Sequence, residues 1–169
     1  MLMWLRIADV FRSFPAQRQV ARKMIELGLR VSPEGKVFCG PVEIKEVSLA
    51  FASGVDRRVV SATVQSILAD AKLSRIFAGI QPAGALLKDI AHDLGFGAVE
   101  IEANAKKPSI IARAATLLAK SGMSIRQVYA KDPELFENPT LVIITERRIP
   151  GAMLNKFSKI PGVRKVSIL

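Results

Sequence analysis

The sequence predicts an α+β chain of two domains, a mainly helical one over residues 1–80 and a β-α-β-β-α-β one over residues 98–169. Apolar residues recur at helical spacing through most of the first stretch, whereas alternating, strand-like segments dominate the second. A segment rich in Gly and Pro, IFAGIQPAG, lies between them and predicts a boundary near Gln81. The next residues, ALLKDIAHDLGF, have helical spacing, so residues 81–97 are expected to form a linker helix that ends at Gly95.

Composition narrows the classes of function. The chain has 169 residues, half of them apolar, and a net charge of +10, which suits a polyanionic partner such as nucleic acid. One cysteine, Cys39, and one histidine, His92, exclude an intrachain disulfide and a metal site built from a cluster of these residues. His92 has no partner motif and the sequence has no Gly-rich phosphate loop, so neither an enzyme nor a bound cofactor is expected.

The apolar segments also bear on location. A membrane-spanning helix needs about 20 apolar residues, and every apolar segment of this sequence is much shorter. The N-terminal MLMWLRIADVF carries Arg6 and Asp9 and lacks a small-residue cleavage site, which indicates an amphipathic helix and not a signal peptide. We therefore expect a cytoplasmic protein with no membrane partner.

The first elements are two helices and a hairpin. Residues 2–13 have a broad apolar stripe, and Pro15 suits the first turn of a second helix, which Gly28 ends. Two β-prone runs, residues 29–31 and 36–38, then flank Ser-Pro-Glu-Gly, a type I turn sequence. They predict a small hairpin, which would make the helical domain a winged one. An ordered loop between helices is an equal alternative.

A helix-turn-helix pattern follows. The first helix has its apolar positions at Ile44, Val47, Ala50 and Phe51, and Gly54 permits a tight turn after it. Asp56 can then cap a second helix, whose buried face carries Val60, Val64 and either Ile67 or Leu68.

The outward face of that second helix is basic at its start, where the helix dipole disfavours positive charge. In a helix-turn-helix such a face enters the major groove, where Arg can contact guanine or phosphate, Gln adenine, and Ser phosphate. An ordinary solvated helix face is the alternative. The predicted DNA-binding residues are Arg57, Arg58, Ser61, Ala62 and Gln65, together with Arg30 and Lys36 of the hairpin.

The second domain alternates strands and helices. GAVEIEAN, IRQVYAKD, TLVIITER and RKVSIL are predicted strands, and helices are predicted from Pro108 to Gly122 and over IPGAMLNKFSKIPGV. This order is the split βαβ arrangement of ferredoxin-like folds. Helices would cover one face of an antiparallel sheet and leave the other face free to pair or dimerise.

These residues carry a family resemblance. The β-α-β-β-α-β order, the run from Pro108-Ser109 through Leu118-x-x-x-Gly122-Met-Ser-Ile125, and the ending IPGVRKVSIL resemble an ACT domain. The whole chain is similar to archaeal predicted regulators of amino-acid metabolism, which join an N-terminal helix-turn-helix to a C-terminal ACT domain. The resemblance implies a transcription regulator that binds double-stranded DNA and an amino-acid effector as a homodimer or higher homo-oligomer.

The resemblance also implies a place for the effector. In ACT domains a ligand binds where the loop after the first strand meets the first helix, and the start of the second strand, often from a neighbouring subunit, completes the pocket. The matching residues here are Asn104, Ala105, Lys106, Lys107, Pro108, Ser109, Gly122, Met123, Ser124 and Ile125. Free N–H groups near Ser109 could hold a carboxylate, and Asn104 an amino group.

The loop before the first helix of this domain departs from the family pattern. Many ligand-binding members have Asp-x-Pro-Gly in that loop, whereas this chain has Asn-Ala-Lys-Lys-Pro-Ser, with Ser109 where glycine is expected. The lost backbone room could change the ligand or abolish binding. The alternative function is an ACT-like interaction or dimerisation module that regulates a metabolic enzyme, with a helical domain that only packs and binds no DNA.

Overall fold

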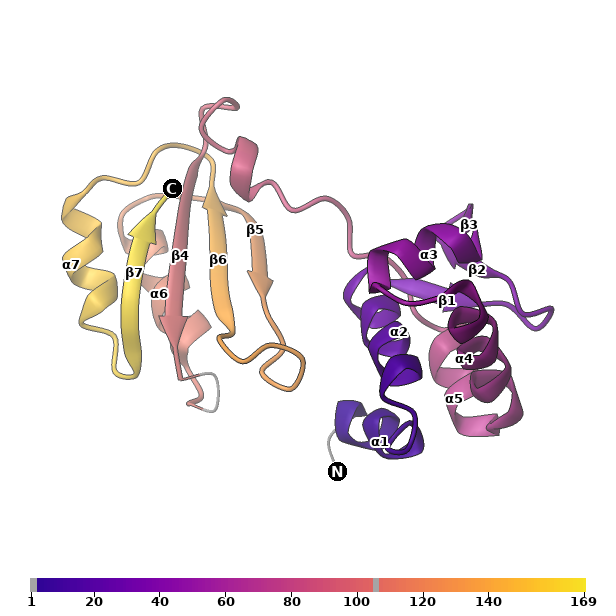
Figure 1. Cartoon of the computed structure of the whole chain (residues 1–169). Helices are drawn as coiled ribbons and strands as arrows, with labels where there is room; N and C mark the ends of the chain where they lie inside the picture. Colours follow the sequence, from indigo (N-terminus) through magenta and orange to yellow (C-terminus); the bar gives the residue numbers. More distant parts are fainter. Residues whose placement is uncertain (1–2, 105–106) are drawn as a thin grey trace. The chain divides into compact units, whose positions relative to one another are not determined.

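The computed structural model describes residues 3–104 and 107–169 and divides into two compact units, Met1–Gly84 and Ala85–Leu169 (Figure 1). Each unit contains helices and one antiparallel sheet. The α+β class predicted from the sequence is therefore confirmed.

Unit 1 is mainly helical with one small sheet. The helices α3 and α4 follow the sheet directly, and α5 closes the unit. Its elements are α1 (Met3–Val10), α2 (Pro15–Glu26), β1 (Leu29–Val31), β2 (Val37–Cys39), β3 (Val42–Ile44), α3 (Glu46–Ser53), α4 (Arg57–Ala69) and α5 (Ala71–Ala78).

Local sequence signals set several of these boundaries. Pro15 occupies the first turn of α2, and Gly28 follows the end of that helix with a φ of +67°, a conformation that glycine adopts without strain. Asp70 caps α5 by accepting hydrogen bonds from the N–H groups of Lys72 and Leu73 at 2.8 and 2.9 Å. The helix α5 was not among the predicted elements.

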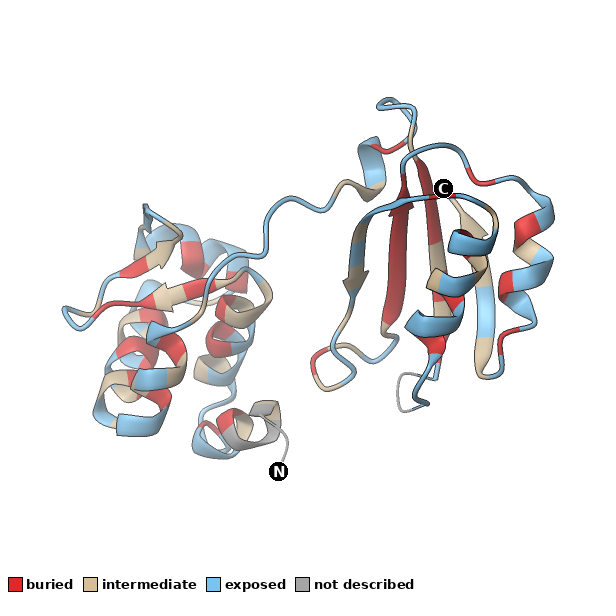
Figure 2. Ribbon diagram, turned by 180° about the vertical axis from the view of Figure 1, so that it is seen from behind, coloured by how far each residue is buried: buried red, intermediate tan, exposed pale blue. Residues whose placement is uncertain are grey.

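The buried face of α3 differs from the prediction. Leu49, Ala50 and Ser53 are buried, whereas Val47 and Phe51 are 63% and 90% exposed. Because the eight-residue helix is apolar on nearly every side, its sequence does not select one face. The helix α4 follows the prediction, with Val60, Val64 and Ile67 in the core of unit 1 (Figure 2).

The predicted hairpin is part of a three-stranded sheet. The strands β1 and β2 pair antiparallel, and a third strand, β3, pairs with β2. The turn between β1 and β2 packs on α4, because a Cβ at Gly35 would lie 3.6 Å from the Val64 side chain and 3.9 Å from the Gln65 amide nitrogen. The sheet therefore lies beside the helix on which the DNA-binding residues were predicted.

Unit 2 has the element order β-α-β-β-α-β, with the strands in the antiparallel order β5-β6-β4-β7. The burial of side chains is most complete along the two central strands, β4 and β6 (Figure 2). The elements are β4 (Gly97–Ala103), α6 (Ile110–Lys120), β5 (Ile125–Ala130), β6 (Thr140–Thr145), α7 (Ala152–Ser158) and β7 (Val163–Ile168).

The two faces of this sheet are covered differently. Both helices pack on one face, where Val99, Ile101 and Ile143 lie in a core with Phe157 of α7 (Figures 1 and 2). The alternate residues point to the other face and meet the segment that precedes β4. This second cluster consists of Leu87, Ala91, Phe96, Ala98, Tyr129, Val142 and Ile144.

That preceding segment corrects two expectations. Residues 81–96 contain only the short 3-10 helix η1 (Lys88–Ile90), not the linker helix expected over residues 81–97, and they cover part of the sheet face that was expected to be free. Contacts with the sheet replace intrahelical hydrogen bonds here. The Gln127 amide accepts from the Leu87 N–H at 3.1 Å and donates to the Ala85 carbonyl at 2.8 Å, and Lys88 pairs with Glu100 at 2.9 Å.

Candidate nucleic-acid interface and ligand pocket

The connection between α3 and α4 is a tight, hydrogen-bonded turn. Gly54 has a φ of +66°, and its N–H donates to the Phe51 carbonyl at 3.1 Å. The Val55 N–H donates to the Ala50 carbonyl, also at 3.1 Å. These bonds satisfy carbonyls at the end of α3 and fix the direction in which α4 leaves.

The start of α4 presents two arginines to solvent. Arg57 and Arg58 are exposed, and within the described residues neither makes an ion pair. The Asp56 carboxylate accepts the Arg58 backbone N–H at 2.8 Å, so it caps the helix. Two cations therefore stand at a helix N-terminus, where an external anion would be stabilised both by their charge and by the helix dipole.

The other predicted DNA-binding residues of α4 differ in how far they are exposed to solvent. Ala62 and Gln65 are exposed. Ser61 is half-buried, and its hydroxyl donates to the Glu46 carboxylate of α3 at 2.8 Å. Ser61 is thus positioned to hold α3 against α4, and its hydroxyl proton is not free for a phosphate.

The hairpin residues have partners within the sheet. Arg30 lies directly opposite Phe38 in the strand pair, and its guanidinium sits 4.4 Å from the centre of the Phe38 ring. Lys36 lies 3.5 Å from Glu43, whose pKa is lowered by the hydrogen bond from Lys45 and by the charge of Lys36. Lys36 therefore brings less net positive charge to this surface than the sequence suggested.

Unit 2 contains a cavity of about 540 Å³ at the first turn of α6. Of the predicted ligand-binding residues, Lys107, Pro108 and Ser109 line it; Asn104 does not, and Ala105 and Lys106 lie outside the described residues. The wall is mostly apolar. Its described members are Ile101, Ala103, Lys107, Pro108, Ser109, Ile110, Ile111, Ala112, Ala130, Lys131, Pro133, Pro139, Thr140 and Leu141.

Ser109 is in a strained conformation at the rim of this cavity. Its φ is +77°, and no other non-glycine residue in the described ranges has a positive φ. The left-handed region costs an L-residue roughly 1–2 kcal/mol. Arg113 supports Ser109 from one turn further along α6 by donating from Nε to the Ser109 hydroxyl at 3.2 Å.

The second group of predicted ligand residues lies at the other end of the sheet. Ile125 is in register with Thr145 and Gly97, whereas the cavity adjoins Ala130 and Leu141. Ala130 is five residues further along β5 than Ile125, which corresponds to about 17 Å. Within one chain, Gly122 to Ile125 therefore do not meet Ser109.

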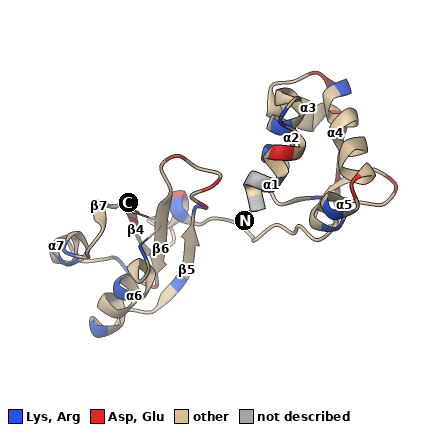
Figure 3. Ribbon diagram, turned by 90° about the horizontal axis from the view of Figure 1, so that it is seen from below, with Lys and Arg blue, Asp and Glu red and all other residues tan. Residues whose placement is uncertain are grey.

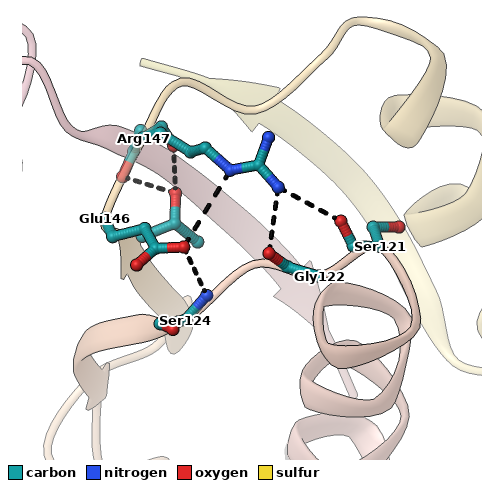
Figure 4. Close-up of polar contacts among 7 residues, drawn as sticks. Ser121, Gly122, Ser124, Glu146 and Arg147 are labelled. Atoms are coloured by element: carbon teal, nitrogen blue, oxygen red, sulfur yellow. Dashed lines mark hydrogen bonds and ion pairs between the residues drawn. The ribbon is translucent and has the colours of Figure 1, made fainter.

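The segment from Gly122 to Ser124 has a structural role instead (Figure 4). The Arg147 guanidinium donates to the carbonyls of Ser121 and Gly122 at 3.3 and 2.9 Å and so caps the end of α6. The Glu146 carboxylate accepts the Ser124 N–H at 3.2 Å. The next member, Met123, is buried in the core beneath the helices.

Sequence reasoning missed the part of the cavity formed by the β5–β6 connection. Lys131, Pro133 and Pro139 come from this connection, whose sequence KDPELFENP has the composition of a turn. The two prolines mark a rigid loop, but only the strand order places it beside α6.

No family model matches the chain, and no curated protein matches it. In the described part of the chain, no helix is long and apolar enough to cross a membrane, and no three His, Cys, Asp or Glu side chains are grouped to hold a metal ion. The function of the chain therefore has to follow from its own residues.

Proposed function

We propose that the chain is a cytoplasmic transcription regulator of amino-acid metabolism, which binds duplex DNA through α3 and α4 and an amino acid through unit 2. The observation that carries the proposal is the pair of exposed arginines, Arg57 and Arg58, at the capped start of α4. In this proposal α3, the turn at Gly54 and α4 form a helix-turn-helix, and unit 2 is an ACT domain.

DNA recognition follows from the side chains of α4. Arg57 and Arg58 would contact phosphates or a guanine edge, and Gln65 an adenine edge two turns further along the helix. The sheet formed by β1, β2 and β3 would act as a wing that brings Arg30 to the adjacent backbone. Ser61 has no direct contact in this arrangement, because its hydroxyl is bonded to Glu46.

The cavity beside Ser109 supports a sensor role for unit 2. A volume of about 540 Å³ lies in the range of small-molecule sites, roughly 300–1,000 Å³. Its apolar wall suits an apolar side chain, and Lys107, Lys131 and the first N–H groups of α6 suit a carboxylate. An amino acid with an apolar side chain has both features.

Pairing of two copies would complete this site. Met123 is buried in its own unit, but the exposed Gly122, Ser124 and Ile125 could reach the cavity from a second copy, so a homodimer is part of the proposal. A ligand that prefers one arrangement of the paired domains would change DNA affinity through that preference.

A second candidate function is an interaction module that regulates a metabolic enzyme without binding DNA. The observation in its favour is the apolar surface of α3, where Phe51 and Val47 are 90% and 63% exposed. Exposed apolar side chains of this size are common at protein–protein contacts.

Salt-dependent binding to duplex DNA separates the two functions. Each neutralised phosphate contributes about −0.9 to the slope of log K against log salt, so Arg57→Ala with Arg58→Ala should reduce the slope by about 2. The matched control is Lys72→Ala with Arg75→Ala on α5, which removes two exposed cations from the same unit. Equal slopes for the two variants would contradict the role of α4.

The sensor role is tested by thermal melts of the full chain against each of the twenty amino acids. Binding to the folded state should raise Tm in a concentration-dependent way for at least one of them. A flat response across the panel would leave unit 2 with a dimerisation role only.

A further inference from the structure

The two segments of unit 2 that contain α6 and α7 carry only one sign of charge. Residues 107–124 and 147–169 contain nine lysines and arginines and no aspartate or glutamate. Figure 3 shows this charge on α6 and α7. The carboxylates of unit 2 are on the other segments, in residues 85–102, in the β5–β6 connection and at Glu146.

Four of these cations converge on one groove. The groove lies between α6 and α7, has a volume of about 350 Å³, and is lined by Arg113, Lys120, Lys156 and Lys159. All four are exposed, and in the described ranges none pairs with a carboxylate. The rest of the lining is Ala112, Thr116, Leu117, Ile160 and Pro161.

The spacing of the cations suits an extended anion. Arg113 and Lys120 are seven residues apart on α6, so they lie on the same face about 10 Å apart along its axis. Lys156 and Lys159 lie opposite them, at the end of α7. A single phosphate cannot contact all four groups closely, whereas a chain of phosphates can.

The character of the groove disfavours a protein partner. Leu117 is half-buried and Ile160 is buried, so the exposed apolar residues of the groove are the small Ala112 and Pro161, and no aromatic side chain is among its described lining residues. The centre of a protein–protein interface is depleted of charged residues and enriched in aromatic ones, which is the opposite composition.

We propose that this groove binds the phosphate backbone of duplex DNA, as a contact separate from that of α4. The choice of DNA as the source of the phosphates rests on the proposed function, whereas the preference for a polyanion rests on the groove alone. Lys120, Lys156 and Lys159 supply ammonium donors to successive phosphates, and Arg113 supplies the guanidinium N–H groups that do not bond Ser109. The contact carries no sequence information.

The test is fluorescence anisotropy of the full chain with duplex DNA over a range of salt concentrations. The groove variant is Lys120→Gln, Lys156→Gln and Lys159→Gln. The control variant is Arg126→Gln, Arg148→Gln and Lys165→Gln, which removes three cations of unit 2 outside the groove. The groove variant should lose about 2.7 from the salt slope, or 0.9 for each lost phosphate contact, and the control should keep the wild-type slope.

Several outcomes overturn the proposal. One is an unchanged slope in the groove variant; another is an equal loss in both variants, which would indicate a general effect of net charge. If the groove variant loses binding to poly-glutamate while its DNA slope is unchanged, the groove belongs to an acidic protein. Exchanging the three lysines for arginine should preserve the slope, which checks that loss of charge and not loss of structure is responsible.

The design separates this inference from the proposed function. If Arg57→Ala with Arg58→Ala leaves the slope unchanged while the groove variant lowers it, the α4 contact is wrong and the groove contact stands. If the groove variant leaves the slope unchanged while Arg57→Ala with Arg58→Ala lowers it, α4 contacts DNA and the groove does not.

Discussion

The Asp56 carboxylate accepts the backbone N–H of Arg58 at 2.8 Å. The acidic residue that directly precedes the two exposed arginines in the sequence therefore caps α4. The cap stabilises the helix start at which Arg57 and Arg58 are disfavoured by the dipole. The same carboxylate would repel DNA phosphates, so the helix carries a compromise between stability and anion binding.

Asp56→Asn separates these two effects. Asparagine caps a helix about as well as aspartate, so the free energy of unfolding should change by less than about 0.5 kcal/mol. Removal of the negative charge should raise DNA affinity about two- to fivefold at low salt. Anisotropy titrations at low and high salt would check this. Asp56→Ala is the comparison, since it also removes the charge but loses the cap. If both variants bind DNA more weakly than the wild type, the Asp56 carboxylate does not oppose DNA binding.

Ser109→Gly should stabilise unit 2. Ser109 has a φ of +77°, and glycine adopts this conformation without the penalty that a side chain incurs. After the extra chain entropy of glycine is subtracted, the expected gain is about 0.5–1 kcal/mol. Calorimetry of the full chain would measure it. Ser109→Ala keeps the strain and removes the hydrogen bond from Arg113, so it should give no gain.

Gly28→Ala should destabilise unit 1 strongly. A Cβ at Gly28 would lie 2.7 Å from the Cα of Pro82, and the residue has a φ of +67°. Strain and steric overlap together should cost about 2–4 kcal/mol. Gly40→Ala is the matched control, because Gly40 also has a positive φ but its Cβ would meet Pro82 at an ordinary 3.8 Å.

Unfolding in urea, followed by the fluorescence of Trp4, reports on unit 1 because Trp4 is the only tryptophan and packs against its core. Equal losses for Gly28→Ala and Gly40→Ala would mean that Pro82 moves away at little cost.

The cap of α5 predicts a pH dependence. The pKa of Asp70 is lowered from its ordinary value of 3.8, because its carboxylate accepts the N–H groups of Leu73 and Lys72. Since the folded pKa lies below the unfolded one, the carboxylate stabilises the fold above the unfolded pKa, and this contribution is lost as the pH falls through the folded value.

The difference in Tm between the wild type and Asp70→Ala should therefore be constant near neutral pH and shrink below about pH 4. Melts followed by Trp4 fluorescence would check this. The Asp70→Asn variant keeps a capping acceptor that does not titrate in this range. Its cap should therefore persist at acid pH, and the difference in Tm between this variant and Asp70→Ala should not shrink below about pH 4.

The sequence predicted those elements whose ends carry their own signals. Pro15 and Gly28 bound α2, and Asp56 with the spacing of Val60 and Val64 defined α4. The alternation in β4 likewise predicted that Val99, Ile101 and Ala103 share one face, but the strand is not half-buried, because the segment before β4 covers part of its other face.

The rest depended on contacts between distant parts of the chain. Neither the exposed face of α3 nor the conformation of residues 85–96 follows from local spacing, because packing on the neighbouring sheet or helices decides both. Only part of the lining of the candidate cavity was predicted, because the rest also depends on contacts between distant parts of the chain. Ser109 could be found from its place before α6, whereas Lys131 and Pro139 reach the cavity through the strand order.

The contacts of the chain on either side of Gly84 leave a short tether between the two units. Pro82 lies against Gly28 in unit 1, and the Ala85 carbonyl is already bonded to Gln127 in unit 2, so only Ala83 and Gly84 lie between these contacts. Two residues offer few rotatable bonds, and a short tether gives a high effective concentration of one module for a site near the other. If α4 and the groove of unit 2 both contact DNA, the first contact makes the second nearly intramolecular, and their affinities multiply. The same tether would make binding by one unit alone a poor measure of the whole chain.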